Sequence, residues 1–218
     1  MTRLHTPGRR VVPVLMAAAW LLTSHIHAAE LIDRVLAVVS GSIITLSDAR
    51  AAIEFGLVET DQAPDPVAVA TAWLVDRQLA LDEVIRADAG DVAPAVVDAR
   101  LRQVEQRFTE RSTFAAALAR CGLNRSGARA FIHDTLRVER YLSRRFEAIL
   151  PGTEEELRAH YAGQPGRFTR DGRPLTFDQA RELVQASLQA ERRKQAIDAW
   201  LSRLRRRTDV TELYPPAR

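Results

Sequence analysis

Apolar residues recur at helical spacing through most of the chain. In the clearest case Val97, Leu101, Val104 and Phe108 step by four, three and four residues, which is typical of one face of an amphipathic helix. This helix starts at Pro94. The other predicted helices cover residues 47 to 56, 66 to 89, 112 to 121, 124 or 126 to 150, 153 to 161 and 176 to 207. Their predicted N-caps are Ser47, Asp65, Ser112, Asn124 or Ser126, Thr153 and Thr176.

Short strands are predicted at the two ends of this helical pattern. Arg34–Val39 is rich in valine and Ile43–Thr45 is β-branched, and the Ser40–Ser42 segment between them predicts a hairpin. Val210–Leu213 is a third strand signal. Because isolated short strands are unstable, we expect the third strand to pair with the hairpin. The predicted fold is therefore mainly α, with several helices and a small sheet made of an N-terminal hairpin and a C-terminal strand.

The first 29 residues have the pattern of a cleavable signal peptide. Three arginines and no acid precede the apolar run Val11–Ser24, and the small residues Ala28 and Ala29 follow it. The apolar run is shorter than the roughly 20 residues that span a bilayer, which disfavours an uncleaved anchor helix. We therefore expect an exported, periplasmic protein without a stable membrane anchor.

Charge is balanced once the signal segment is set aside. Without its three arginines the chain's 31 basic residues fall to 28, equal to its 28 acidic residues. This balance gives no basic footprint for nucleic acid, so no such partner is predicted. The charge is uneven along the chain, since Glu30–Arg100 is acidic and Arg181–Arg207 is basic. We expect these two segments to attract each other weakly.

Catalytic and metal-binding patterns are absent from the sequence. Beyond the signal segment the chain has two histidines, His133 and His160, and neither has a His or Cys neighbour at metal-ligand spacing. His160, near a helix end, is interpreted as a surface group. Cys121 is the single cysteine, which excludes an intrachain disulfide, and its position between Leu118 and Leu123 predicts a small buried residue. We therefore expect a protein that is not an enzyme and needs no cofactor or metal.

The longest predicted central helix carries more large apolar residues than one stripe requires. Its main stripe consists of Ile132, Leu136, Leu142, Phe146 and Ile149. Phe131, Val138 and Tyr141 lie off this stripe, and they are the candidate residues for binding an apolar peptide segment in a groove beside the helix. The alternative is that a second helix packs over them. The sequence leaves both interpretations open.

Several segments resemble the SurA-type periplasmic chaperones. The residues that carry the resemblance are Ile32–Asp48, Cys121–Asn124 followed by Arg129, Ile132 and Arg137, Thr153–Leu157 with Tyr161 and Phe168, and Leu175–Phe177 with the helix to Arg207 and the strand at Val210. Together they cover most of the chain after the signal segment. The resemblance implies the peptide-binding chaperone core of that family, folded as one unit over residues 30–218.

One departure from the family pattern changes the expected activity. Relatives usually carry parvulin-type prolyl isomerase domains between the N-terminal part, here residues 30–168, and the C-terminal helix and closing strand, here residues 176–218. In this chain the segment Gly163–Pro174 is a short polar stretch, and the insertion point at residues 169–175 is predicted to be a loop. It is too short to fold as such a domain. The family's catalytic histidines have no counterpart.

The resemblance thus implies an ATP-independent holdase without the parvulin domain. Its expected partners are unfolded or partly folded exported proteins, outer-membrane protein precursors in particular, bound through apolar grooves; a homo-oligomer is possible. The alternatives are a dedicated assembly or scaffold subunit for one envelope partner and, less favoured, a peptidyl-prolyl isomerase. A holdase suppresses the aggregation of unrelated clients, whereas a scaffold does not.

Overall fold

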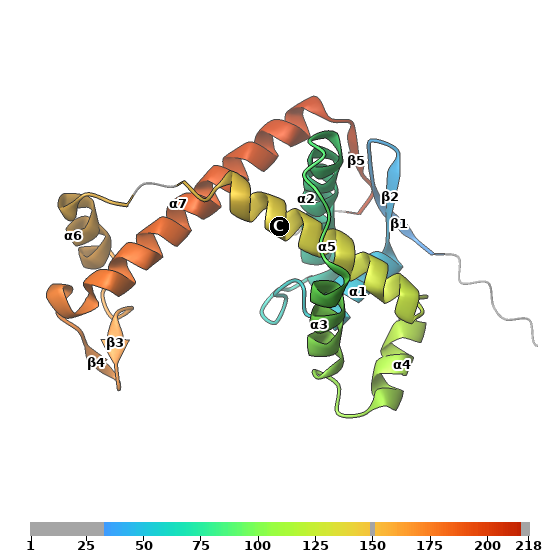
Figure 1. The fold of residues 1–218 in the computed structure, drawn as a ribbon, viewed down its shortest axis with the longest axis horizontal. Helices are drawn as coiled ribbons and strands as arrows, with labels where there is room; N and C mark the ends of the chain where they lie inside the picture. Colours follow the sequence, from blue (N-terminus) through green and yellow to red (C-terminus); the bar gives the residue numbers. More distant parts are fainter. Residues whose placement is uncertain (1–32, 149–150, 215–218) are drawn as a thin grey trace, which may run out of the picture. The chain divides into compact units, whose positions relative to one another are not determined.

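The computed structural model describes residues 33–148 and 151–214 (Figure 1). The predicted signal peptide at residues 1–29 lies outside this part. The helices are α1 Leu46–Glu54, α2 Pro66–Arg86, α3 Pro94–Glu105, α4 Arg111–Arg120, α5 Arg125–Arg145, α6 Glu154–Ala162 and α7 Phe177–Arg207. The strands are β1 Val35–Val39, β2 Ser42–Thr45, β3 Thr169–Arg170, β4 Arg173–Pro174 and β5 Val210–Glu212. The fold is mainly helical with a small antiparallel sheet, as predicted.

The three-stranded sheet joins residues from both ends of the described chain. Ser40 and Gly41 connect β1 to β2 with positive φ angles of 48° and 87°, the conformation that a tight two-residue hairpin requires. The strand order is β2-β1-β5, and β5 runs antiparallel to β1 with Val38 opposite Thr211. The predicted pairing of the C-terminal strand with the hairpin is therefore confirmed, and its partner is the first strand of the hairpin.

The first helix begins earlier than the sequence predicted. Its N-cap is Thr45, not Ser47: the Thr45 hydroxyl accepts a hydrogen bond from the backbone N–H of Asp48, and the Asp48 carboxylate accepts one from the backbone N–H of Thr45 at 2.8 Å. Such a reciprocal box requires the acidic residue three positions after the cap, which selects Thr45. Ser47 lies inside the first turn and is buried.

The start of α4 differs from the prediction, and that of α5 is one of the two predicted residues. Glu110, not Ser112, is the N-cap of α4, where the Thr113 hydroxyl donates to the carbonyl of Glu110. Asn124 rather than Ser126 is the cap of α5, because its side chain accepts from the N–H of Gly127 at 2.8 Å. The same helix ends at Arg145, earlier than the predicted Leu150.

Two adjoining clusters of buried side chains form the core around α5. The sheet-side cluster combines β1, α2 and the C-terminal half of α7, and its members include Leu36, Leu79, Val84, Trp200 and Leu204. The other cluster combines α1, α3, α4 and the start of α5, and its members include Phe55, Val97, Phe114, Cys121 and Ile132. The predicted burial of Val97, Leu101, Val104 and Cys121 is confirmed.

A third cluster fills the space between α6 and the first half of α7. Phe168 and Leu175 are buried there with Leu157, Ala180 and Val184. The predicted loop at 169–175 is wrong in this respect, because β3 and β4 form a hairpin between Phe168 and Leu175. The backbone N–H of Leu175 donates to the carbonyl of Phe168 at 2.9 Å, which closes the hairpin over the cluster.

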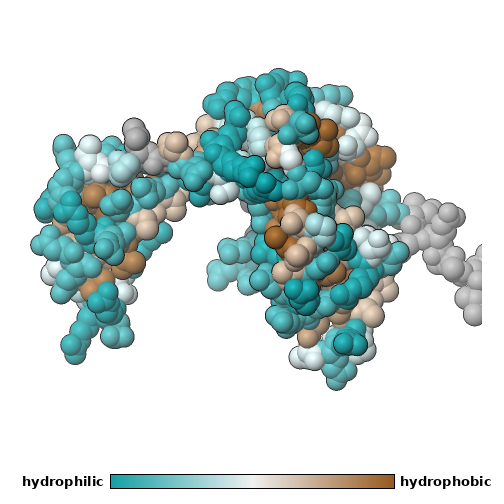
Figure 2. Space-filling view, in the orientation of Figure 1, coloured by the Kyte–Doolittle hydropathy of each residue, from teal (hydrophilic) through white to brown (hydrophobic). Residues whose placement is uncertain are grey.

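Some large apolar residues of the helices are exposed. Ile85, in the last turn of α2, is 59% exposed and Leu183 in α7 is 49% exposed. In α7 the inward positions belong to Ala180 and Val184, which lie four residues apart on one face. Hydrophilic residues cover most of the face shown in Figure 2, and apolar residues reach it in separate patches.

The expected attraction between the acidic and basic segments takes the form of ion pairs between α7 and α2. Arg205 Nε lies 2.9 Å from Asp76 Oδ1, and Arg207 Nη2 lies 2.7 Å from Glu83 Oε1. Exposed pairs of this kind contribute little individually. Their consistent direction, from the last turns of α7 to α2, nevertheless orients α7 on the core.

Candidate functional site

The three candidate binding residues of α5 are packed to different extents. Val138 is only 7% exposed and belongs to the sheet-side core, so for this residue the alternative of burial under a neighbouring element is correct. Its position follows from the buried face of α5, which consists of Ala128, Ile132, Thr135 and Val138. Phe131 and Tyr141 are half-buried and pack against the same core.

Neighbouring elements cover much of the Phe131 and Tyr141 rings. The guanidinium carbon of Arg77 lies 4.6 Å from the centre of the Phe131 ring, and the Phe55 ring meets it edge-on at 6.2 Å. The Tyr141 ring lies 6.0 Å from that of Trp200. Both rings are thus partly covered by other elements, and Phe131 also lines a small pocket of about 230 Å³ beside α5, together with Arg77 and Asp134.

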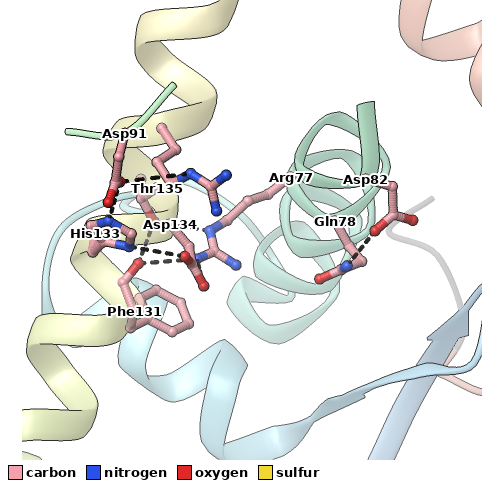
Figure 3. A network of polar contacts seen from close by, with 9 residues as sticks. Arg77, Gln78, Asp82, Asp91, Phe131, His133, Asp134 and Thr135 are labelled. Atoms are coloured by element: carbon pink, nitrogen blue, oxygen red, sulfur yellow. Dashed lines mark hydrogen bonds and ion pairs between the residues drawn. The ribbon is translucent and has the colours of Figure 1, made fainter. Parts of the chain in front are cut away.

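Arg77 joins α2 to α5 through a mostly buried guanidinium (Figure 3). Its Nε donates to Thr135 Oγ1 at 2.9 Å and its Nη2 donates to the carbonyl of Phe131 at 3.0 Å. Asp134 is 4.0 Å away. Burial lowers the pKa of Arg77, although the side chain remains protonated at neutral pH. Since its donors face α5, this cation connects two helices.

A second polar cluster ties the loop before α3 to α5 (Figure 3). His133 Nε2 lies 2.6 Å from Asp91 Oδ1, and its Nδ1 lies 3.2 Å from Asp134 Oδ1. The Asp91 carboxylate also accepts from the backbone N–H of Val92 at 2.7 Å. That backbone bond, followed by the hydrogen bond from His133, lowers the pKa of Asp91. The carboxylate therefore stays ionised and holds the loop on α5.

His160 is buried between α6 and α7, which corrects its interpretation as a surface group. Its side chain is 7% exposed, its Nε2 lies 2.9 Å from Ser187 Oγ, and its Nδ1 lies 3.5 Å from Glu191 Oε2. Ser187, His160 and Glu191 thus contact one another in the same order as the serine, histidine and carboxylate of a hydrolytic triad. However, Ser187 lies in the interior of α7, where helix hydrogen bonds occupy the backbone N–H groups that an oxyanion would need. The Gln164 amide also lies 3.3 Å from both ring nitrogens.

Residues 33–148 and 151–214 hold neither a metal-binding cluster nor a helix that could span a membrane. No group of three or more His, Cys, Asp or Glu side chains in this part of the chain could hold a metal ion. Within the same residues, no helix is both long and apolar enough to cross a membrane.

An open groove lies between the C-terminal end of α3, the loop that follows it, and α4. We call it the α3–α4 groove; its volume is about 770 Å³. Its lining residues are Arg102, Glu105, Gln106, Phe108, Thr109, Glu110, Arg111, Phe114, Ala115, Leu118 and Arg125. The volume falls within the range of sites that bind small molecules or side chains of a peptide.

The floor of the α3–α4 groove is apolar and firmly supported. The rings of Phe108 and Phe114 lie 5.4 Å apart, and that of Phe114 lies 6.5 Å from the core residue Phe55. Phe114 and Leu118 are each 7% exposed, whereas Ala115 is exposed beside them. The floor is thus a continuation of the core, and Ala115 is the small residue at its open side.

The sequence contained signals for this groove that the helical periodicity did not reveal. Phe108 was assigned to the inward stripe of α3, but the helix ends at Glu105, so the ring lies on the loop at the groove's edge. The alanine run Ala115–Ala117 in α4 supplies little side-chain volume between Phe114 and Leu118. A short alanine-rich helix beside two phenylalanines leaves space that larger residues would fill.

Cys121 provides a test of the packing beneath the groove. The thiol is 1% exposed, and burial, followed by the charge of Glu54, raises its pKa. Since the thiolate is the reactive form, we expect a disulfide reagent to label the folded protein at pH 8 at least about a hundredfold more slowly than the denatured protein. Equal labelling rates with and without denaturant would contradict the burial.

No family model matches the chain, and no curated protein matches it in sequence.

Proposed function

We propose that the protein is an ATP-independent periplasmic chaperone of the SurA type, without a parvulin domain. In this proposal it holds unfolded exported proteins, including outer-membrane protein precursors, by apolar segments that enter the α3–α4 groove. The observation that carries the proposal is the open groove with a phenylalanine and leucine floor and a charged rim. The sequence resemblance to the chaperone core supports the same function independently.

The physical character of the groove suits weak and unspecific binding. Burying one leucine or phenylalanine side chain contributes about 1.5–3 kcal/mol, which by itself gives only transient attachment. Apolar contacts do not require a particular amino-acid sequence, so the groove can bind many different clients. A client that folds withdraws its apolar residues and leaves, without any need for nucleotide hydrolysis.

A substitution at Ala115 tests this function. We expect Ala115→Trp to fill the groove and to raise about tenfold the protein concentration needed to suppress aggregation, which corresponds to about 1.4 kcal/mol of lost apolar burial. Light scattering of two unrelated denatured clients measures the effect. Ala115 is exposed, so the melting temperature should stay close to that of the unsubstituted protein.

Ala116→Trp is the matched control, since Ala116 is also exposed on α4 but does not line the groove. It should protect clients as well as the unsubstituted protein. Full protection by Ala115→Trp would move the client site away from this groove. Suppression confined to one client would favour a dedicated scaffold, and accelerated isomerisation of an Xaa-Pro peptide would favour the enzyme.

A further inference from the structure

The rim of the α3–α4 groove carries an excess of available positive charge. Among the described residues, Arg102 on α3 and Arg111 on α4 line the groove, are exposed and make no ion pair. Arg125, also on the rim, is paired with Glu105. The rim is therefore basic at two positions that come from opposite walls.

The acidic residues of the same rim offset only part of its positive charge. Glu105 forms the ion pair with Arg125, and Glu110 Oε2 accepts a hydrogen bond from the Ser112 hydroxyl at 3.0 Å at the start of α4. Glu110 keeps its charge, because a hydroxyl donor does not neutralise it, so among the described rim residues two arginines without an ion pair face one such carboxylate. The electrostatic complement of the groove is consequently an anion beside an apolar group.

We infer that the α3–α4 groove selects peptide segments in which a large apolar residue is flanked by carboxylates. The apolar side chain would lie over Phe108 and Phe114, and Asp or Glu side chains on either side would meet Arg102 and Arg111. The inference rests on the proposed function and narrows its client class. A peptide fits this surface better than a nucleic acid because the floor is formed by buried aliphatic and aromatic groups that continue the core.

The selection should be moderate and sensitive to salt. Exposed ion pairs are individually weak, and two of them together give a preference of about tenfold at low ionic strength. Screening shortens the reach of such charges from about 30 Å at 0.01 M to about 3 Å at 1 M salt. The preference for acidic flanks should therefore decline with added salt, while the apolar contribution persists.

Fluorescence anisotropy with three labelled peptides tests the inference on the whole chain. The peptides share one central Leu-Phe pair and are flanked by Asp, Asn or Lys. We expect the Asp-flanked peptide to bind about tenfold more tightly than the Lys-flanked one at low salt, with the Asn-flanked peptide between them. A labelled peptide that is displaced by a single-stranded oligonucleotide but not by unlabelled peptide would overturn the inference.

Charge reversal of the rim gives the decisive comparison. In the double variant Arg102→Glu with Arg111→Glu the order should invert in favour of the Lys-flanked peptide. Arg203→Glu with Arg206→Glu, at exposed positions of α7 that do not line the groove, should keep the original order.

The possible outcomes distinguish the charge selection inferred here from the proposed chaperone function. If all three peptides bind equally, or if rim reversal leaves the order unchanged, the charge selection is wrong while apolar client binding stands. If no peptide binds, both are overturned. Blockage of Asn-flanked binding by Ala115→Trp, together with the inverted order in the rim variant, would establish both.

Discussion

Truncation after Arg207 is expected to lower the melting temperature by at least about 6–12 °C. The truncated chain loses β5 and with it the bonds Ser40 N–H to Asp209 and Leu213 N–H to Leu36, in addition to the strand ladder. Several bonds of about 1 kcal/mol each amount to about 3 kcal/mol, and in a chain of this size each kcal/mol corresponds to about 2–4 °C. Thermal unfolding followed by circular dichroism measures the change.

Side-chain contacts add to the expected loss. The truncation also removes the Glu212 partner of Arg205 and the hydrogen bond from the Tyr214 hydroxyl to Asp65 Oδ2. A chain that ends at Tyr214 is the matched control, because it keeps every one of these groups and should melt with the full-length protein. If the chain that ends at Arg207 melted at the same temperature as this control, β5 would not stabilise the sheet.

The double variant Phe131→Ser with Tyr141→Ser is expected to lose about 4 kcal/mol of stability. Replacing one fully buried aromatic by a small residue costs about 3–5 kcal/mol, and these two rings are each half-buried. Phe131→Ser also leaves Arg77 without the ring below its guanidinium. Denaturant unfolding gives the free energy, and a loss of this size separates packed residues from free binding residues.

Serine substitutions at Ile85 and Val96 form the control for this variant. These residues are 59% and 51% exposed, so their replacement should change stability by no more than about 0.5 kcal/mol each. Client protection per folded molecule should be the same in both double variants, because neither touches the α3–α4 groove. If the Phe131 and Tyr141 variant kept its stability but no longer protected clients, the client site would instead lie on α5.

The features that the sequence predicted correctly depend on local signals. The Ser40-Gly41 turn, the Asp65-Pro66 helix start and the Thr153 and Thr176 capping boxes each arise from residues within four positions of one another. Local hydrogen bonds and backbone preferences are sufficient for such features. One signal of the same kind was missed: Asp171-Gly172, with positive φ at both residues, is the turn of the β3–β4 hairpin.

The candidate site could not be predicted in the same way because exposure depends on distant partners. Val138 is buried by α2 and α7, and His160 by α7, which no periodicity within α5 or α6 indicates. The α3–α4 groove exists because α3 ends before Phe108 and because the small alanine side chains of α4 leave the space between the two helices open. These are properties of three elements together, so the helical stripes predicted the core positions of α3 but gave no sign of the α3–α4 groove.

The pairing of β1 with β5 also sets the order in which the chain can fold. β1 is synthesised well before β5, so its second neighbour exists only after residues 210–212 have been made. Until then one edge of β1 has unpaired backbone groups, which makes the nascent chain prone to strand exchange with other chains. Completion of the three-stranded sheet is thus a long-range event that comes late in the folding of these residues.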